Sequence, residues 1–304
     1  MRVAVTGSNG FLGKEVVKHL RERGFQVTEC TRKDCNVLDQ KQVTQKLSGA
    51  GIVVHCAAQL DEEAQDLFEV NVRGTENVLE ASAKNQVEQF IFLSTVGVYG
   101  AAKGVKTEAS PLVPETSYEK SKLEAEKKVN SYQELFHVTV LRPAIIAGNN
   151  SYWRKIIRMV GKGFPLIGKG ENKWQLVCVE DVAEAVVLCI GNEACYGEAF
   201  NVAEKEGMTL RELAEFIRGE LGMGEKVMSI PLWLGKMIAA INGLVGVVPM
   251  LSPAYLRRLN RERAYSTEKL RKLGWAAKQS GKECLKKVII ANLESFSAFA
   301  RFNR

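Results

Sequence analysis

The sequence has little of what a metal centre or a disulfide framework needs. Its 304 residues include only three histidines, and none of them stands near cysteines or carboxylates at the spacing of metal ligands. The seven cysteines show neither a paired framework nor C-x-x-C spacing. We therefore expect no metal site, and cysteines that are reduced thiols lying mostly in the core.

The sequence also lacks the segments that export a protein or anchor it in a membrane. Met1 leads directly into an apolar strand, without the basic, apolar and small-residue succession of a signal peptide, so we expect a cytoplasmic protein. The most apolar stretch, residues 232–251, is interrupted by Lys236, Asn242, Pro249 and several glycines. It is too broken to predict a membrane span. We interpret it as part of the core or of a substrate pocket, with a contact to a membrane surface or a partner as the alternative.

Positive charge is concentrated in the last fifth of the chain. The net charge is +7, and residues 245–304 hold 13 Lys/Arg against 4 Asp/Glu. These cations could attract a phosphate or an anionic lipid, or simply form solvated helix faces. No nucleic-acid-binding motif accompanies them, so we expect no nucleic-acid partner. The basic residues in question are Arg257, Arg258, Arg261, Arg263, Arg271, Lys272, Lys286 and Lys287.

A strand, a glycine turn and a helix open the chain. Residues 2–6 are suited to a buried parallel strand, and residues 11–23 switch to helical spacing. Between them, Gly7 permits a tight reversal, Gly10 lets the backbone approach a pyrophosphate, and Gly13 lets the helix pack on the strand. The helix N-terminus then offers free N–H groups to an anion. This context predicts a dinucleotide-binding turn.

Strands and helices alternate along the first half of the chain, which predicts a parallel sheet with right-handed crossovers. We expect an α/β protein in which residues 1–150 form a Rossmann-type, doubly wound NAD(P)-binding domain, its sheet completed by segments near 175–203. Residues 151–304 are expected to form a smaller, mostly helical substrate-binding region. Strands are expected near residues 2–6, 25–31, 52–58, 89–94, 138–142, 175–179 and 199–202, and helices near 11–23, 61–84, 117–135, 152–160, 180–190 and 209–221.

The end of the second strand bears on the choice of cofactor. An acidic side chain there binds a ribose 2′-hydroxyl, whereas an arginine accommodates a 2′-phosphate. This chain offers Thr31, Arg32 and Lys33 and no carboxylate. We therefore expect NADP, with NAD as the alternative. The next strand ends in small residues at 56–58, which leave room for a cofactor at the sheet edge.

Tyr118 and Lys122 are four residues apart on an expected helix, so they share one face and are separated by roughly 6 Å of rise. A lysine ammonium near a phenol stabilises phenolate and lowers the tyrosine pKa, which suits acid–base work near neutral pH. Ser94 and Thr95 bring hydroxyls to the end of the preceding strand. Thr95 is the better candidate to orient a substrate oxygen.

With these motifs in place, the sequence resembles the extended short-chain dehydrogenase/reductase superfamily, also called the NAD-dependent epimerase/dehydratase family. The matching stretches are Thr6–Gly13, Asn36–Asp39, His55–Ala58, Asn71–Thr75, Leu93–Gly100, Tyr118–Lys122, Leu141–Pro143 and Val179–Ala183. The resemblance implies that Tyr118 is the catalytic acid/base, that Lys122 lowers its pKa and binds the nicotinamide ribose, and that Thr95 is the catalytic hydroxyl.

The residues and the resemblance together define an expected cofactor-binding set. Asn36 falls where the family usually has an aspartate beside the adenine, and its amide can still hydrogen-bond the base. Asn71 is expected either to support the active site or to act as a buried structural amide. The full set is Gly7, Asn9, Gly10, Phe11, Leu12, Gly13, Arg32, Asn36, Val37, Cys56, Ala57, Ala58, Asn71, Ser94, Tyr118, Lys122 and Pro143.

The resemblance leaves the substrate open and slightly favours a nucleotide-sugar. Family members that act on nucleotide-sugars commonly carry an arginine five residues before Val179, where this chain has Trp174; Lys169, Lys173 or the basic tail would have to substitute. The glycine-rich residues 162–168 with Arg32 instead resemble the dihydroflavonol-reductase-like and 3β-hydroxysteroid-dehydrogenase-like branches, which suit an apolar alcohol or ketone.

A non-catalytic NADP-binding sensor or assembly subunit is a further alternative. The family resemblance also suggests a homodimer paired through the helices near 61–84 and 117–135.

Overall fold

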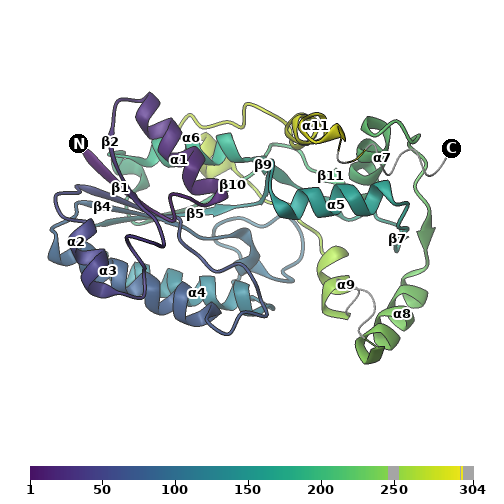
Figure 1. Cartoon of the computed structure of the whole chain (residues 1–304), viewed down its shortest axis with the longest axis horizontal. Coiled ribbons are helices and arrows are strands. Elements are labelled where there is room, and N and C mark those ends of the chain that lie inside the picture. Colours follow the sequence, from purple (N-terminus) through teal and green to yellow (C-terminus); the bar gives the residue numbers. More distant parts are fainter. Residues whose placement is uncertain (246–252, 295, 297–304) are drawn as a thin grey trace.

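A six-stranded parallel sheet lies at the centre of the molecule between two layers of helices (Figure 1). This computed structural model describes residues 1–245, 253–294 and 296. The strand order is β10-β5-β4-β3-β1-β2, which is doubly wound as predicted. The strands are β1 (Arg2–Thr6), β2 (Gln26–Cys30), β3 (Ile52–His55), β4 (Gln89–Leu93), β5 (His137–Pro143) and β10 (Glu198–Val202).

Alternation along the strands divides the core between the two faces of the sheet. Val3 and Val5 of β1 pack with α1 (Phe11–Glu22) and α6 (Val179–Cys189) on one face. Ala4 packs on the other face, with a layer of three helices. Those are α2 (Gln40–Lys46), α3 (Gly74–Lys84) and α4 (Ser117–Asn130). All parallel strands therefore end at one edge, where doubly wound folds bind ligands.

The helix expected from residue 61 begins about six residues later. Residues 61–66 form turns, and the helix includes a π-helical segment at Glu69–Arg73 before α3. Side chains compete with the helix here, because Gln59 accepts the backbone N–H groups of Leu60 and Asp61, and Asp61 accepts that of Glu63.

The remaining elements build a second, smaller core beside the carboxyl ends of the strands (Figure 1). Its helices are α5 (Ser151–Gly161), α7 (Leu210–Glu220) and α11 (Gly281–Ala291). Helix α7 begins with the expected capping box of Thr209 and Glu212. Beyond this core lie α8 (Leu232–Val245) and α9 (Pro253–Leu259), and α10 (Glu268–Arg271) packs on β10.

Within residues 1–245, six short strands pair outside the main sheet. The segment near residue 175 was expected to extend that sheet, but β9 (Leu176–Cys178) instead pairs with β6 (Ile145–Ala147). Only β10 takes the added edge position beside β5. The other short pairs are β7 (Leu166–Ile167) with β12 (Ser229–Ile230), and β8 (Lys173–Trp174) with β11 (Met208–Thr209).

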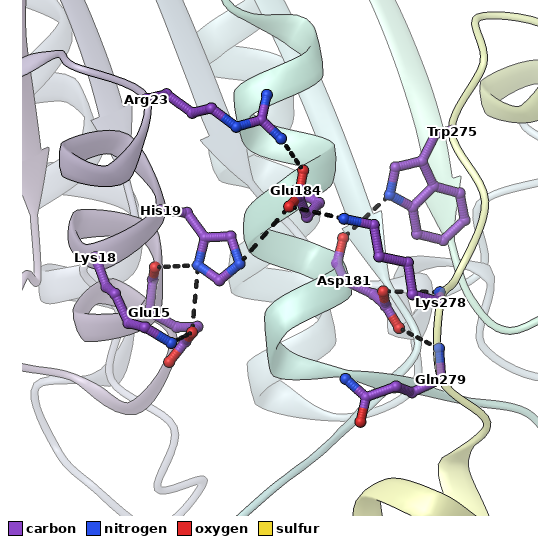
Figure 2. Close-up of polar contacts among 9 residues, drawn as sticks. All are labelled: Glu15, Lys18, His19, Arg23, Asp181, Glu184, Trp275, Lys278 and Gln279. Carbon is purple, nitrogen blue, oxygen red and sulfur yellow. Dashed lines mark hydrogen bonds and ion pairs between the residues drawn. The ribbon is translucent and has the colours of Figure 1, made fainter.

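A polar network on α6 joins the first helix to the C-terminal segment (Figure 2). The buried carboxylate of Asp181 accepts the backbone N–H groups of Lys278, at 2.9 Å, and Gln279. Glu184 accepts hydrogen bonds from Arg23 of the α1 C-cap and from the Lys278 ammonium, at 2.9 and 3.0 Å. The matching stretch Val179–Ala183 therefore has a structural task through Asp181, which holds the C-terminal segment on α6.

Among the described residues, no helix is long and apolar enough to cross a membrane. Residues 246–251 of the apolar segment noted in the sequence lie outside the described part of the chain, and its first fourteen residues form α8.

Candidate active site

The turn between β1 and α1 forms a cradle in which Gly7 and Gly13 have no room for a side chain. Gly7 has a φ of +65°, and a Cβ there would lie 2.8 Å from the Ala57 backbone. A Cβ on Gly13 would lie 2.1 Å from the carbonyl oxygen of Gly7. Helix α1 has no side-chain cap at Gly10, so its first N–H groups remain available to an anion. The cradle fits the pyrophosphate of a dinucleotide.

A hollow of about 240 Å³ opens over this cradle. Nine of the expected cofactor-binding residues line it together: Gly7, Asn9, Gly10, Arg32, Asn36, Val37, Cys56, Ala57 and Ala58. Cys35, Gln59 and Val70 also line it and were not expected from the sequence. They come from loops and the π-helical segment, whose approach to the sheet edge depends on the tertiary fold.

Several other expected residues lie around the hollow rather than among its lining residues. Leu12 packs against the main core, and Pro143 is buried at the end of β5. Phe11, at the start of α1, lies against Gly148. The amide of buried Asn71 is used within the protein, accepting from the Gln59 N–H at 2.7 Å and donating to Ser121 Oγ at 2.9 Å. Asn71 therefore braces the loop after β3 against α4.

The three expected catalytic residues come from two neighbouring elements. Tyr118 and Lys122 lie one turn apart on α4, which begins with a capping box of Thr116 and Glu119. Thr95 follows β4 and caps the short helix Val96–Tyr99, its hydroxyl accepting the Gly97 N–H at 3.0 Å. A Cβ on Gly97 would lie 2.9 Å from Glu119 Cγ, so glycine lets the Thr95 loop approach α4 beside Tyr118.

The electrostatics of Tyr118 differ from the expectation. Burial, with the charges of Glu119 and Glu62 adding to it, raises the pKa of Tyr118 to about 12. The expected lowering by Lys122 is absent, because the Lys122 ammonium lies 4.1 Å from the centre of the Phe92 ring and acts chiefly with Glu126 and Cys56. Without dinucleotide, Tyr118 is therefore a protonated phenol at neutral pH.

The basic tail meets this site directly. Arg261 is an ion-pair partner of Glu119 at 2.7 Å and also of Glu115, and Arg258 pairs with Glu62 at 2.7 Å. Both carboxylates that disfavour the Tyr118 phenolate are thereby countered by arginines from the far end of the chain. The sequence suggested solvated faces or an anion site for these cations and gave no sign of this pairing.

Lys122 is almost completely buried, and burial lowers its pKa to about 8, with Glu126 and Cys56 acting in the opposite direction. Cys56 lines the hollow over the cradle, so the Lys122 charge acts at the dinucleotide site. The role of Lys122 in binding the nicotinamide ribose, which the family resemblance implies, stays a prediction.

We expect Lys122→Met to change how the stability of the cofactor-free protein depends on pH. Between pH 8 and 10 the unfolded chain keeps this lysine protonated, since its ordinary pKa is 10.5, while the folded protein has released the proton. The unfolded state then binds more protons, so the Lys122 contribution to stability rises with pH over this window, by about 2 kcal/mol. Urea unfolding at both pH values should show the wild type gaining that amount relative to Lys122→Met. The exposed Lys120→Met should show no such gain, and a pH-independent difference for Lys122→Met would contradict the burial of its charge.

Beneath Lys122 lies a buried ion pair that the sequence did not reveal. Glu126 of α4 accepts from Arg142 Nη2 at 2.7 Å and from Arg142 Nε at 3.1 Å, and also from Ser94 Oγ. Arg142 Nη1 donates to the Tyr99 hydroxyl at 2.9 Å. Ser94 and Arg142 thus serve to fix α4 against β4 and β5.

His55 is a core histidine, as expected. It is fully buried between two hydroxyls, with Nδ1 2.6 Å from Thr6 Oγ1 and Nε2 3.0 Å from Thr75 Oγ1. Thr75 Oγ1 donates to the Asn71 carbonyl, so the network assigns the His55 proton to Nε2. Burial lowers the pKa of His55 to about 3, which keeps the ring neutral.

Six of the seven cysteines meet in pairs that sequence spacing does not show: Cys30 with Cys35, Cys178 with Cys284, and Cys189 with Cys195. In each pair the hydrogen bond between the thiols and burial raise the pKa of the first cysteine. Cys178, Cys284 and Glu180 place ligand atoms within 4.8 Å of one another, one donor fewer than a structural zinc site uses.

A doubly wound sheet with a glycine cradle and a Tyr-x-x-x-Lys helix defines a short-chain dehydrogenase/reductase. More particularly, the model of the NAD-dependent epimerase/dehydratase family matches residues 3–203, and the chain belongs to that family. It is therefore an enzyme, which removes support from the alternative of a non-catalytic subunit.

Three similar proteins illustrate the range of this family. UDP-glucose 4-epimerase of Vibrio cholerae is 28% identical over 96% of both chains. N-acetyl-alpha-D-glucosaminyl-diphospho-ditrans,octacis-undecaprenol 4-epimerase of Escherichia coli O157:H7 is 28% identical over 77% of both. The crystal structure of a short-chain dehydrogenase/reductase superfamily protein from Agrobacterium tumefaciens with bound NAD superposes with a TM-score of 0.78. It covers 99% of this chain and 100% of its own at 19% identity.

Proposed function

We propose that this enzyme acts on a secondary carbinol of a sugar carried on a diphosphate, with a nucleotide-sugar favoured. As an epimerase or dehydratase it oxidises the sugar and then re-reduces it, whereas as a reductase it carries out net reduction of the corresponding ketone. The observation that carries the proposal is that the loop after Thr95 closes on α4 through Gly97 and Glu119, next to Tyr118, in a sheet whose first strand leads into a glycine cradle. Both named epimerases among its relatives act on sugar diphosphates, which supports this choice over net redox of an unrelated alcohol.

Each side chain then has a defined task. Tyr118 Oη takes the proton from the carbinol and returns it, and the Thr95 hydroxyl orients the same oxygen. Lys122, buried with its charge acting at Cys56 in the lining of the hollow, holds a ribose hydroxyl. The positive charge of a bound nicotinamide would lower the Tyr118 pKa. A nicotinamide dinucleotide, held by the cradle and the lining of the hollow, supplies the acceptor and donor of hydride.

Arg263 is the basic-tail residue that we assign to the anionic part of the substrate. Its guanidinium lies 4.3 Å from the centre of the ring of Trp174, the residue that stands where nucleotide-sugar enzymes commonly have arginine. Arg263 Nη1 is buried without a hydrogen-bond partner among the described residues. Lys169 is largely exposed and near Glu171, so it is the weaker choice. A buried, unpaired guanidinium is suited to a phosphate oxygen.

The direct test is turnover of UDP-glucose. Purified protein with NAD or NADP is expected to convert UDP-glucose, or another UDP-sugar of a panel, to its epimer or to a dehydrated or reduced product, detected by chromatography. Mass spectrometry of the untreated protein should find any retained dinucleotide. Retention of a sterol-like or ketone-bearing lipid, with no conversion of any sugar diphosphate, would overturn the proposal.

Such an outcome would favour a second candidate, an enzyme of the dihydroflavonol-reductase-like or 3β-hydroxysteroid-dehydrogenase-like type acting on an apolar alcohol or ketone. Trp174 supports this candidate, because its buried ring lies at a cavity lined by apolar side chains.

We propose NADP as the preferred cofactor because Arg32 is the charged residue in the lining of the dinucleotide hollow. Its side chain is 82% exposed, with a loose contact of 3.8 Å to Asp66, so it is free to turn toward a 2′-phosphate. Arg32→Ala is expected to weaken NADP binding about tenfold, the loss of roughly one charge-assisted hydrogen bond, and to leave NAD binding unchanged. Calorimetric titration measures both, with Lys33→Ala as the control. Equally tight binding of NAD and NADP by the wild type would overturn the proposed preference for NADP.

We further propose that residues 151–304 form the substrate side of the site, that the protein is a homodimer paired through α3 and α4, and that it works in the cytoplasm. The family resemblance supports the dimer. Sedimentation of the purified protein would measure its size.

A further inference from the structure

A second cavity, of about 240 Å³, lies in the C-terminal part of the molecule, away from the dinucleotide hollow. Helices α5, α7 and α8 and strands β7 and β8 enclose it. Its lining includes Ile156, Trp174, Leu213, Ile217, Gly235 and Ile238.

The chemistry of this cavity is that of a hydrocarbon site. The described side chains that line it are all apolar, and the indole N–H of Trp174 donates to the Leu259 carbonyl instead of pointing to a ligand. Apolar cavities of about 150 Å³ stay dry and admit benzene, so this one has room for a chain of about ten carbon atoms. The lining side chains offer water no hydrogen-bond partner, so we expect the cavity to stay dry.

A cationic hollow of about 680 Å³ adjoins helix α8, which also lines the apolar cavity, and helix α9. Lys103, Lys236 and Arg257 line it, and none of the three forms an ion pair within the described part of the chain. Arg261, Glu115 and Glu262 also line it, so the lining carries four cations against two carboxylates. Arg261 is paired with Glu115 and Glu119, and Glu262 accepts the backbone N–H of Lys173 at 3.0 Å. Because Glu115 leads into the N-terminus of α4, this hollow borders the end of the helix that carries Tyr118.

Helix α8 separates the two spaces. Gly235 and Ile238 face the apolar cavity, while Leu232 and Lys236 face the cationic hollow. A Cβ on Gly235 would lie 2.1 Å from Ile167 Cγ2, so the glycine lets α8 close over β7. Figure 1 shows α8 at the periphery, beyond α9, and its outer residues Trp233 and Met237 are 67% and 49% exposed. The apolar surface thus continues outside the cavity.

We propose that the apolar cavity binds an isoprenoid or alkyl chain of the substrate while the cationic hollow binds the diphosphate to which the chain is attached. The site described above then receives a sugar carried on a lipid diphosphate as well as one carried on a nucleoside diphosphate. This assignment rests on the proposed function, to which it adds a second class of carrier. On α8, Lys236 faces the cationic hollow while Gly235 and Ile238 face the apolar cavity. A ligand with an anionic head and a hydrocarbon chain can therefore contact both spaces.

Geranyl diphosphate, which has a ten-carbon isoprenoid chain and no sugar, tests the site without catalysis. We expect the full-length protein to bind it at least tenfold more tightly than inorganic diphosphate, measured by calorimetry. Ile238→Asn, at the cavity wall, should remove that preference. Lys236→Gln should weaken the binding of both ligands by a similar factor of about three to ten.

Met237→Asn is the matched control, since it alters the neighbouring exposed position outside the cavity lining. It should retain the preference for geranyl diphosphate. Equal binding of the two ligands by the wild type, or an equal loss in Met237→Asn and Ile238→Asn, would overturn the proposal, because the chain would then not occupy the cavity.

Turnover separates this inference from the function on which it rests. If UDP-glucose is epimerised while geranyl diphosphate shows no preferential binding, the proposed function stands and the lipid site is wrong. If geranyl diphosphate binds as expected but no sugar diphosphate is turned over, the lipid site stands and the proposed function is wrong.

Discussion

Tyr118→Phe should lower turnover about a thousandfold while leaving dinucleotide binding within a factor of two. The substitution removes one oxygen, and with it the atom that exchanges a proton with the carbinol; general acid–base groups typically contribute factors of about 10² to 10⁴. The ring stays in place, so the packing of α4 against the Thr95 loop is kept. Dinucleotide binding relies on the cradle and the hollow, which the phenol hydroxyl does not line.

A matched control is Tyr132→Phe, which removes a phenol just beyond the C-terminus of α4, where the ring stacks on Phe136. It should retain wild-type turnover. Single-turnover rates with a converted sugar diphosphate, and fluorescence titration with dinucleotide, measure the two properties separately. Turnover of Tyr118→Phe within tenfold of wild type would remove this residue from the proton path.

The sequence pattern correctly predicted the parts of the fold that are determined by neighbouring residues, such as the glycine turn, the helix cap and the strands of the sheet. Gly13 must be glycine because the helix passes within contact distance of Gly7, and Thr209 with Glu212 marks a helix start by itself. The six strands of the sheet follow from their apolar runs. The predicted helix start at residue 61 was wrong, because Gln59 and Asp61 accept backbone N–H groups in local turns that keep residues 61–66 out of the helix.

What the sequence could not predict depends on contacts between distant segments. Arg261 lies 142 residues from its partner Glu119, and its sequence context is an ordinary basic helix end. Cys178 and Cys284 likewise meet only in the folded chain. The Tyr-x-x-x-Lys spacing correctly placed Tyr118 and Lys122 one turn apart on one helix. It could not show that Lys122 turns toward Phe92 and Glu126, and hence that the Tyr118 pKa is raised in the cofactor-free protein.

The buried ion pair beneath the site yields the largest expected effect on stability. Glu126 and Arg142 have side chains only 2% and 6% exposed. Removing the carboxylate in Glu126→Ala leaves the Arg142 guanidinium buried without its counter-charge, which costs about 3–5 kcal/mol. Restoring a neutral core with the double variant Glu126→Leu with Arg142→Met should recover most of that loss, because a buried ion pair and a well-packed apolar pair are of similar stability. Urea unfolding followed by circular dichroism measures each variant.

Helix α4 supplies its own control in the exposed pair of Glu124 and Lys127, whose N–O distance of 2.7 Å equals that of the buried pair. Their side chains are 50% and 63% exposed, so Glu124→Ala should change stability by about 0.5 kcal/mol at most. The two ion pairs have the same N–O distance, so a larger loss of stability in Glu126→Ala than in Glu124→Ala would show that burial, rather than geometry, determines the contribution of the Glu126 pair. A loss of stability below about 1 kcal/mol in Glu126→Ala would mean that water reaches Arg142 once the carboxylate is removed. The region of the Glu126–Arg142 pair would then not be sealed from solvent in the variant.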